Sequence, residues 1–329
     1  MYPPGCGRKN PFLHIRVCAL KEQSSFRRAR TDADSVFRQK PHHGPDPAAV
    51  MRKLFTGSEA GITRMKHGVG GEYWDAVSST WENHRQSLWR RHSDAVNCSL
   101  LRRWLSGSGL GSVLKTDLFD EMCGDGLFPM LRSMARRVVG IDISPTILEK
   151  ARRRHPELCC VATDVLHLPF ADGSFDCVVS NSTLDHFESR EEIAASIAEL
   201  HRVLRGGGRM ILTMDNPGNP FVALRNGLPF RILRRLGITP YYVGATCGAA
   251  ELRRLLEKTG FTITEETVVL HCPRVFAVAL ARLFDRFAPS ALNRCFLSVL
   301  MSFERMDRFP TKRVTGYFVA VRATKKMSF

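Results

Sequence analysis

Acidic residues and glycines occur at the ends of apolar stretches in the middle of the chain, where they could bind a polar ligand. Residues 120–126 read Asp-Glu-Met-Cys-Gly-Asp-Gly. Glycines let the backbone approach a ligand closely, and a helix that starts beside them offers free N–H groups. Asp142 ends the next apolar stretch. A carboxylate there can accept hydrogen bonds from both hydroxyls of a ribose, so this pattern indicates a nucleoside site.

A third acid, Asp164, follows the third apolar stretch. Its carboxylate can accept a hydrogen bond from an adenine amino group, while the backbone N–H of Val165 faces a ring nitrogen. The third glycine of a dinucleotide fingerprint would fall at position 129, which is occupied by Pro129. This residue counts against a site for NAD.

Residues 180–187 bring several polar side chains to the end of the fourth apolar stretch. They read Ser-Asn-Ser-Thr-Leu-Asp-His-Phe. The carboxyl ends of parallel strands form the ligand crevice of an open α/β sheet. A histidine at that place can act as a general base when a carboxylate orients it. We therefore predict His186 and Asp185 as catalytic residues, with helix capping by the same two side chains as the structural alternative.

Alternating strands and helices must position these groups. Short β-rich stretches predict strands at Val113–Phe119, Arg137–Ile141, Cys159–Thr163, Asp176–Ser180 and Arg209–Thr213. Helices are predicted between most of them, at Leu127–Ala135, Pro145–His155 and Glu191–Leu204. Apolar strands separated by helices predict a parallel sheet covered on both faces, and right-handed crossovers make it a doubly wound α/β fold.

In this order and spacing, the motifs resemble the class I S-adenosylmethionine-dependent methyltransferases, specifically the type 11 domain of the small-molecule subgroup. The resemblance covers residues 112–216 strongly and the final strands weakly. It implies a seven-stranded Rossmann-like methyltransferase sheet whose last strand, Gly316–Arg322, is antiparallel. It also implies S-adenosyl-L-methionine as the cofactor.

The resemblance assigns cofactor contacts to residues at the strand ends. The implied cofactor-binding residues are Asp117, Asp120, Glu121, Cys123, Gly124, Gly126, Asp142, Ile143, Asp164, Val165, Asn181 and Ser182. Gly124 and Gly126 would line the methionine part, and the end of the fourth strand would face the methyl group. The family usually has a glycine where this chain has Met122. Its first-strand acid corresponds to Asp117, Asp120 or Glu121, and the motif leaves the three open.

Charge and composition divide the chain into four regions. The net charge of +16 comes from basic flanks, because residues 51–216 are neutral and residues 217–329 carry +11. We predict a disordered basic tail (1–50), a helical N-terminal extension (51–111), the cofactor-binding core (112–216), and a substrate lid with the last strands and a helical insertion (217–329). For the tail, an organelle transit segment and a true start at Met51 are alternatives.

The predicted function is methyl transfer from S-adenosylmethionine to a small, partly apolar molecule, with a lipid-like acceptor and contact with a membrane surface as options. The alternatives are an RNA or protein methyltransferase that uses the basic flanks, and a non-catalytic cofactor-binding regulator. Few aromatic residues accompany the basic C-terminal region, so nucleic acid is disfavoured. The ten scattered cysteines favour a reducing, cytoplasmic location. No spacing of Cys and His suits a metal, and the sequence leaves the oligomeric state open.

Overall fold

Seven strands form one mixed sheet in the computed structural model of the chain, which describes residues 70–81, 87–105, 107, 109–235, 239 and 241–327. The strands are β1 (Leu110–Lys115), β2 (Ala135–Asp142), β3 (Cys159–Ala162), β4 (Phe175–Asn181), β5 (Leu204–Asp215), β6 (Phe261–Val269) and β7 (Phe318–Lys325). Their order is β3-β2-β1-β4-β5-β7-β6. β1 to β5 run parallel, and β7 pairs antiparallel with β5 and β6. The predicted doubly wound α/β fold is therefore confirmed, including its antiparallel last strand.

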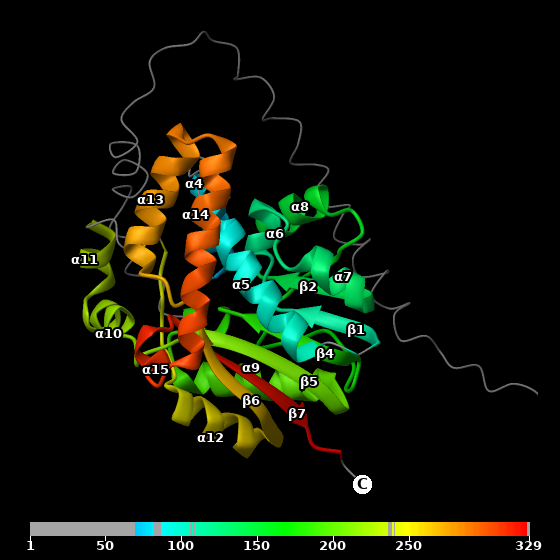
Figure 1. The fold of residues 1–329 in the computed structure, drawn as a ribbon. Helices are drawn as coiled ribbons and strands as arrows, with labels where there is room; N and C mark the ends of the chain where they lie inside the picture. The colour runs from blue at the N-terminus through cyan, green and yellow to red at the C-terminus, as the bar shows by residue number, and fades with distance from the viewer. Residues whose placement is uncertain are drawn as a thin grey trace, which may run out of the picture. The chain divides into compact units, whose positions relative to one another are not determined.

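Helices cover both faces of the sheet (Figure 1). The helices on one face are α5 (Ser87–Leu105), α7 (Phe128–Met134) and α8 (Pro145–Arg154), and those on the other are α9 (Arg190–Val203) and α12 (Ala249–Thr259). Successive side chains of a strand point to opposite faces. In β4, Cys177 and Val179 belong to the buried cluster around α5, whereas the buried Val178 between them does not. The sheet thus separates two apolar layers.

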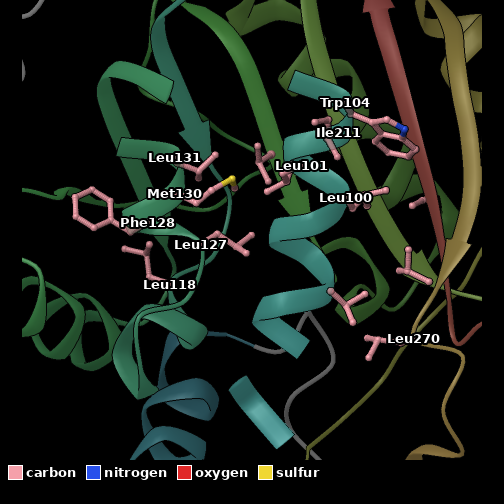
Figure 2. Packing of buried hydrophobic residues seen from close by; sticks show 14 of the residues in the cluster. Leu100, Leu101, Trp104, Leu118, Leu127, Phe128, Met130, Leu131, Ile211 and Leu270 are labelled. Atoms are coloured by element: carbon pink, nitrogen blue, oxygen red, sulfur yellow. The ribbon is translucent and has the colours of Figure 1, made fainter. Parts of the chain in front are cut away.

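The larger apolar layer fixes α5 against the sheet. Figure 2 shows Leu100, Leu101 and Trp104 of α5 close to Ile211 of β5, with buried residues of α7 nearby. All three α5 side chains are buried. Full burial of a large apolar side chain contributes roughly 1.5–3 kcal/mol, so this contact holds the N-terminal helices on the core.

Further helices precede β1 and interrupt the chain after β5. They are α4 (Gly71–Trp81), α10 (Pro220–Gly227), α11 (Phe230–Arg235), α13 (Arg274–Phe287), α14 (Ser290–Ser302) and α15 (Lys312–Thr315), with a 3₁₀ segment η2 (Phe303–Arg308). These helical additions are as the sequence predicted. Among the described residues, no helix has both the length and the apolar character needed to cross a bilayer. The predicted basic tail lies outside the described residues, and the four predicted region boundaries stay predictions.

The predicted strand Val113–Phe119 was wrong at its carboxyl end. β1 stops at Lys115, and Phe119 already begins the short helix α6 (Phe119–Cys123). The chain turns there because the side chain of Asp117 accepts a hydrogen bond from the backbone N–H of Phe119 at 3.1 Å. A carboxylate that binds a backbone N–H two residues ahead stabilises a turn at the expense of a strand.

Candidate functional site

The carboxyl ends of β1, β2 and β4 meet at one edge of the sheet. We call residues 115–126 and 142–144 the β1–β2 side of this edge. Residues 181–187, 215 and 241–242 form the β4–β5 side. The hydroxyl of Thr183 joins the two, because it donates to Asp117 Oδ2 at 3.3 Å and lies 2.7 Å from the hydroxyl of Thr116.

A buried ion pair organises the loop after β1. Lys115 is 1% exposed and Glu121 is fully buried, with Lys115 Nζ 2.9 Å from Glu121 Oε2. Lys115 also donates to the backbone carbonyl of Asp117 at 2.5 Å, and the backbone N–H of Leu127 donates to Glu121 Oε1 at 2.9 Å. Burial lowers the pKa of Lys115, but Asp117 and Glu121 raise it above its ordinary value, so the amine stays charged.

Gly126 leaves room for the carboxylate of the ion pair. Gly126 has a φ of +56°, and a Cβ there would lie 2.6 Å from Glu121 Oε1, so only glycine fits beside the carboxylate. Met122, which replaces the family's glycine, is buried in the apolar cluster. A Cβ at Gly124 would meet no atom closer than 4.0 Å, and neighbouring Cys123 is partly buried. In this loop, therefore, Met122 packs into the apolar cluster, and only Gly126 is required by its surroundings.

The structure distinguishes the three acids that the sequence left open. Both carboxylate oxygens of Glu121 have protein partners in the interior. Asp120 binds Arg90 Nη1 at 2.5 Å, and the Arg90 guanidinium lies over the ring of Phe119. The Asp117 side chain is 22% exposed and lies beside Thr183 of the opposite side. Asp120 is equally exposed, so what sets Asp117 apart is its contact with Thr183 of the opposite side of the edge.

Asp142 lies at the end of β2 with its carboxylate held by backbone N–H groups. The N–H of Ser144 donates to Oδ1 at 2.9 Å and the N–H of Leu118 donates to Oδ2 at 3.0 Å. Burial raises the pKa of Asp142 to about 7. Because each carboxylate oxygen has two acceptor sites, both oxygens retain capacity for a further donor.

Apolar surface accompanies the acids at the ends of β2 and β3. The side chain of Ile143 is 37% exposed directly after Asp142. Beyond β3, Val165 is buried, and Asp164 Oδ1 accepts the backbone N–H of Leu166 at 3.0 Å. Thus Asp164 stabilises a local turn through one of its two carboxylate oxygens.

Residues at the end of β4 form a tight polar turn. Ser182 has a φ of +52°, a region that costs a non-glycine residue on the order of 1 kcal/mol. Its N–H donates to the carbonyl of Thr213 at 3.1 Å, and its hydroxyl donates to Asp185 Oδ2 at 2.8 Å. The hydroxyl of Thr213 donates to Asn181 Oδ1 at 2.8 Å. Contacts with β5 therefore hold this turn in a strained conformation.

His186 is oriented by a backbone carbonyl. It lies in the 3₁₀ turn η1 (Leu184–His186), and its Nδ1 is 3.0 Å from the carbonyl oxygen of Tyr242. A carbonyl only accepts hydrogen bonds, so Nδ1 carries the proton and the neutral ring has its lone pair at Nε2. The ring centroid lies 4.8 Å from that of Trp74 and 5.6 Å from that of Tyr241. This geometry suits a proton acceptor inside an aromatic cage.

Asp185 lies behind His186 in the interior. Its Oδ1 is 3.9 Å from His186 Nε2, and its side chain is 1% exposed. Burial and then the charge of Asp215 raise the pKa of Asp185. Asp215 is itself paired with Arg225, whose Nη2 lies 2.5 Å from Asp215 Oδ2. The β4–β5 side thus combines a histidine with a buried carboxyl group that resists ionisation.

Helix α4 covers both sides of the edge. Asp75 binds the hydroxyl of Ser144, and it accepts the backbone N–H of Thr146 at 3.1 Å. Its neighbour Trp74 packs on His186, and the hydroxyl of Tyr73 accepts the backbone N–H of Tyr242 at 2.6 Å. Consecutive residues of one helix thereby contact the β1–β2 side and the β4–β5 side.

The predicted site residues fall into two groups, and several contributors were missed. Asp117, Asp142, Ser182, Asp185 and His186 lie around the edge that α4 covers, whereas Glu121 belongs to the interior. Sequence analysis did not identify the contacts of Trp74 with His186, of Lys115 with Glu121, or of Arg225 and Arg274 with Tyr317. A lysine inside an apolar strand was the one available signal, because a buried cation requires an acidic partner.

The residues of the β1–β2 side fit a positively charged nucleoside such as S-adenosylmethionine. Asp94, Asp117, Asp120 and Glu121 influence one another there, against the cations Lys115 and Arg90. Burial and the charge of Asp120 raise the pKa of Asp94 to about 8, as expected where carboxylates outnumber cations. A ligand with a sulfonium and an ammonium would relieve this repulsion. In the described residues, no group of three or more His, Cys, Asp or Glu is placed to bind a metal.

Comparisons with known proteins agree with this geometry. A family model described as a methyltransferase domain matches residues 119–212. A probable S-adenosylmethionine-dependent methyltransferase of Mycolicibacterium smegmatis is 28% identical over 156 residues, which are 47% of this chain and 55% of the relative. The demethylmenaquinone methyltransferase of Beutenbergia cavernae is 32% identical over 177 residues, which are 50% of this chain and 66% of the relative. The chain belongs to the class I S-adenosylmethionine-dependent methyltransferases.

S-adenosylmethionine is the cofactor of this methyltransferase family, as the sequence predicted. The chain spans between about half and two thirds of the length of the curated relatives that it matches. The fold agrees with a chain of the complex between the Haloferax volcanii Trm112 methyltransferase activator and a candidate methyltransferase, with a TM-score of 0.50 and 15% identity. That comparison covers 77% of this chain and 99% of the other.

Proposed function

We propose that the chain transfers a methyl group from S-adenosylmethionine to a small, partly apolar molecule. The proposal rests on one observation above all: α4 contacts both Ser144, beside the buried carboxylate Asp142, and His186, so an acid suited to ribose and a base lie along one edge. Asp142 would accept the ribose hydroxyls and Asp117 the ammonium group. Ile143 and Val165 would flank the adenine, and Asp164 would accept its amino group.

The remaining predicted cofactor contacts keep supporting roles in this proposal. Gly124 and Cys123 would pass along the methionine part, while Asn181 and Ser182 would present their backbone to it. The loop itself would be held in place by residues that do not contact the cofactor. Asp120 binds Arg90, Glu121 binds Lys115, and Gly126 leaves room for the Glu121 carboxylate. In this proposal the chain binds the family's cofactor, although Met122 replaces one glycine of the motif.

The acceptor is proposed to bind on the β4–β5 side. Aromatic rings dominate there, since Trp74 lies near Phe119, His186 and Tyr241, with ring centroids 4.8 to 6.4 Å apart. Such a wall favours a flat or apolar acceptor and excludes water. A relative that is named a demethylmenaquinone methyltransferase supports an acceptor with an apolar part.

The chain's chemical role would be to hold the acceptor and remove its proton. When bound, the cofactor supplies a methyl group that is already strongly electrophilic. His186 Nε2 would accept the proton that the acceptor loses, while the Tyr242 carbonyl keeps Nδ1 protonated and the ring in place. The positive charge of the imidazolium formed would then favour ionisation of Asp185, whose Oδ1 lies 3.9 Å away. Closure by α4 would shield these groups from water.

A product search tests the proposal. The purified chain is incubated with S-adenosylmethionine labelled on its methyl group and with apolar and polar fractions of cell extract. We expect label in a small molecule of the apolar fraction, and loss of that label with Asp117→Asn but not with Glu149→Gln, an exposed carboxylate of α8. Label in RNA or protein alone would contradict the proposed acceptor. Cofactor binding without label in any fraction would instead favour the regulator.

A further inference from the structure

Helix α13 has two apolar faces, and within the part of the chain that the structure describes only one of them is covered. Ala277 and Ala281 are buried against the core. Four large side chains that recur at spacings of four, three and four residues stay exposed: Phe276 (67%), Leu280 (46%), Leu283 (52%) and Phe287 (71%). This spacing places them along one stripe of the helix. A stripe of this kind on a helix surface marks an interaction site.

Neighbouring helices also expose large apolar side chains. Exposed large side chains also occur on α10, α11 and α14: Phe221, Leu224, Ile232, Leu292 and Val299. α14 packs on α13 through Phe284 and Phe296, whose ring centroids are 4.6 Å apart. α10 meets the start of α13 at the ring of Tyr317, which both the Arg225 and the Arg274 guanidinium contact. Figure 1 shows α13 and α14 as an antiparallel pair that projects from the sheet.

The charge of these helices points to an anionic partner. α10, α11, α13 and α14 contain eight arginines and one carboxylate, Asp285. That carboxylate is bonded within the fold, because it accepts hydrogen bonds from the hydroxyl of Ser87 and from the backbone N–H of Leu88. Arg225 is buried and paired with Asp215, whereas five of the eight arginines are exposed: Arg231, Arg235, Arg282, Arg286 and Arg294. The exposed surface therefore combines phenylalanine and leucine with arginine, as interfacial helices do.

We propose that α10, α11, α13 and α14 form a docking surface for an anionic lipid bilayer. The apolar stripe would enter the interface between head groups and acyl chains, while arginines such as Arg282 and Arg286 bind the head groups. The Arg286 guanidinium lies 5.3 Å from the ring centroid of Phe287, so a positive charge and an exposed apolar side chain are adjacent on this surface. A second copy of the chain is disfavoured as occupant, because pairing two such surfaces would bring like charges together.

The surface adjoins the proposed acceptor site. α10 follows β5 directly, and its Arg225 is bonded to Asp215 at the end of that strand. A bilayer on this surface would deliver an acceptor with an apolar tail to the β4–β5 side. Membrane docking itself needs no methyl transfer, so it can fail or succeed independently of the proposed function.

Vesicle sedimentation tests the docking surface. The full chain is mixed with vesicles of phosphatidylcholine, or of phosphatidylcholine with phosphatidylglycerol, and bound protein is measured against lipid concentration. We expect binding to the anionic vesicles and little to the neutral ones. The double variant Phe276→Ser/Phe287→Ser should bind these vesicles at least about tenfold more weakly, because it loses two large apolar side chains. Arg282→Gln/Arg286→Gln should weaken binding most at low salt.

A matched control separates docking from general stickiness. Met327→Ser replaces a 64% exposed apolar side chain beside the glycines at the opposite end of β5, and it should bind as the unaltered chain does. The substituted residues are exposed, so thermal unfolding should be unchanged in all variants. Absence of binding to anionic vesicles, or equal binding of the double phenylalanine variant, would overturn the proposal. So would a dimer that this variant dissociates without any vesicle binding, since the surface would then belong to a second copy.

Discussion

The two sides of the crevice are held together in different ways. On the β1–β2 side, carboxylates bind backbone N–H groups and a buried cation that lie within about one strand–helix unit of the chain: Leu118 and Ser144 at Asp142, Leu127 and Lys115 at Glu121. These contacts are buried and directional. Hydrogen bonds and ion pairs of this kind fix geometry, as a site for one invariant cofactor requires.

The β4–β5 side is assembled from distant segments. Trp74, Tyr242 and Asp185 surround His186 although more than a hundred residues separate the first two in the sequence. Aromatic packing dominates there, and it tolerates changes of shape better than a buried ion pair does. The difference teaches that the proposed cofactor side depends on contacts between neighbouring segments, whereas the proposed acceptor side depends on packing between distant ones.

The sharpest test of the β1–β2 side is removal of its buried cation. Lys115→Met leaves the buried Glu121 carboxylate without its cationic partner, so we expect the free energy of unfolding to fall by about 3–5 kcal/mol. Urea unfolding followed by circular dichroism measures this. Arg153→Met removes one partner of the exposed Arg153–Glu149 pair and should cost at most about 1 kcal/mol. Equal losses for the two variants would contradict a structural role for the buried pair.

A substitution on the β4–β5 side should lower turnover and leave the affinity for the cofactor unchanged. His186→Ala removes the proposed base, so kcat should fall about a hundredfold while the affinity for S-adenosylmethionine stays unchanged. Steady-state kinetics with the acceptor found in the product search measures this. His201→Ala, in α9 on the other face of the sheet, is the control. An unaltered kcat would remove His186 from the mechanism.

Asp142 predicts that the free energy of unfolding depends on pH. Its pKa of about 7 in the folded chain lies above the ordinary value of 3.8, so the folded state binds the proton more tightly than the unfolded state. Its contribution to stability is therefore present at low pH and is lost as the pH rises toward and through 7. The slope is up to about 1.4 kcal/mol per pH unit between the two values. Between pH 5 and pH 8 we expect a loss of about 2–3 kcal/mol from this group in the chain free of cofactor.

The measurement compares the unaltered chain with Asp142→Asn. Urea unfolding from pH 5 to pH 8 should show a smaller loss of stability in the variant. Asp94, whose pKa is also raised, contributes equally to both and cancels in the difference. Parallel curves for the two chains would show that Asp142 is not buried as described.

The smallest expected effect concerns the helix that joins the two sides. Asp75→Ala removes the acceptor for the Ser144 hydroxyl and the Thr146 N–H. Loss of these bonds should destabilise docking of α4 by about 1–2 kcal/mol. Amide hydrogen exchange over 71–81 should then become faster by about tenfold. Ser79→Ala, an exposed position on the same helix, should leave exchange unchanged, and equal rates in both variants would mean that α4 is held by other contacts.

The fold and the positions of the acids at the strand ends were accessible from the sequence because both depend on local pattern. Strand-ending acids such as Asp142, and Ser144 as a helix cap, obey rules of spacing, and the cap is present, with Ser144 Oγ accepting the N–H of Ile147 at 3.1 Å. The path after β1 was not accessible, because it depends on Lys115 finding Glu121 in the interior. The same holds for Trp74 and Tyr242 at His186, since no local pattern reveals a contact between distant segments.

Calorimetric titration of the folded chain with S-adenosylmethionine and with its demethylated product tests the central claim, that the β1–β2 side binds this nucleoside through Asp142. The account predicts heat of binding for the unaltered chain, an affinity at least about tenfold weaker for Asp142→Asn because charge-assisted hydrogen bonds are lost, and no change for Glu149→Gln. No heat with either nucleoside, or equal affinities for the unaltered chain and Asp142→Asn, would contradict it.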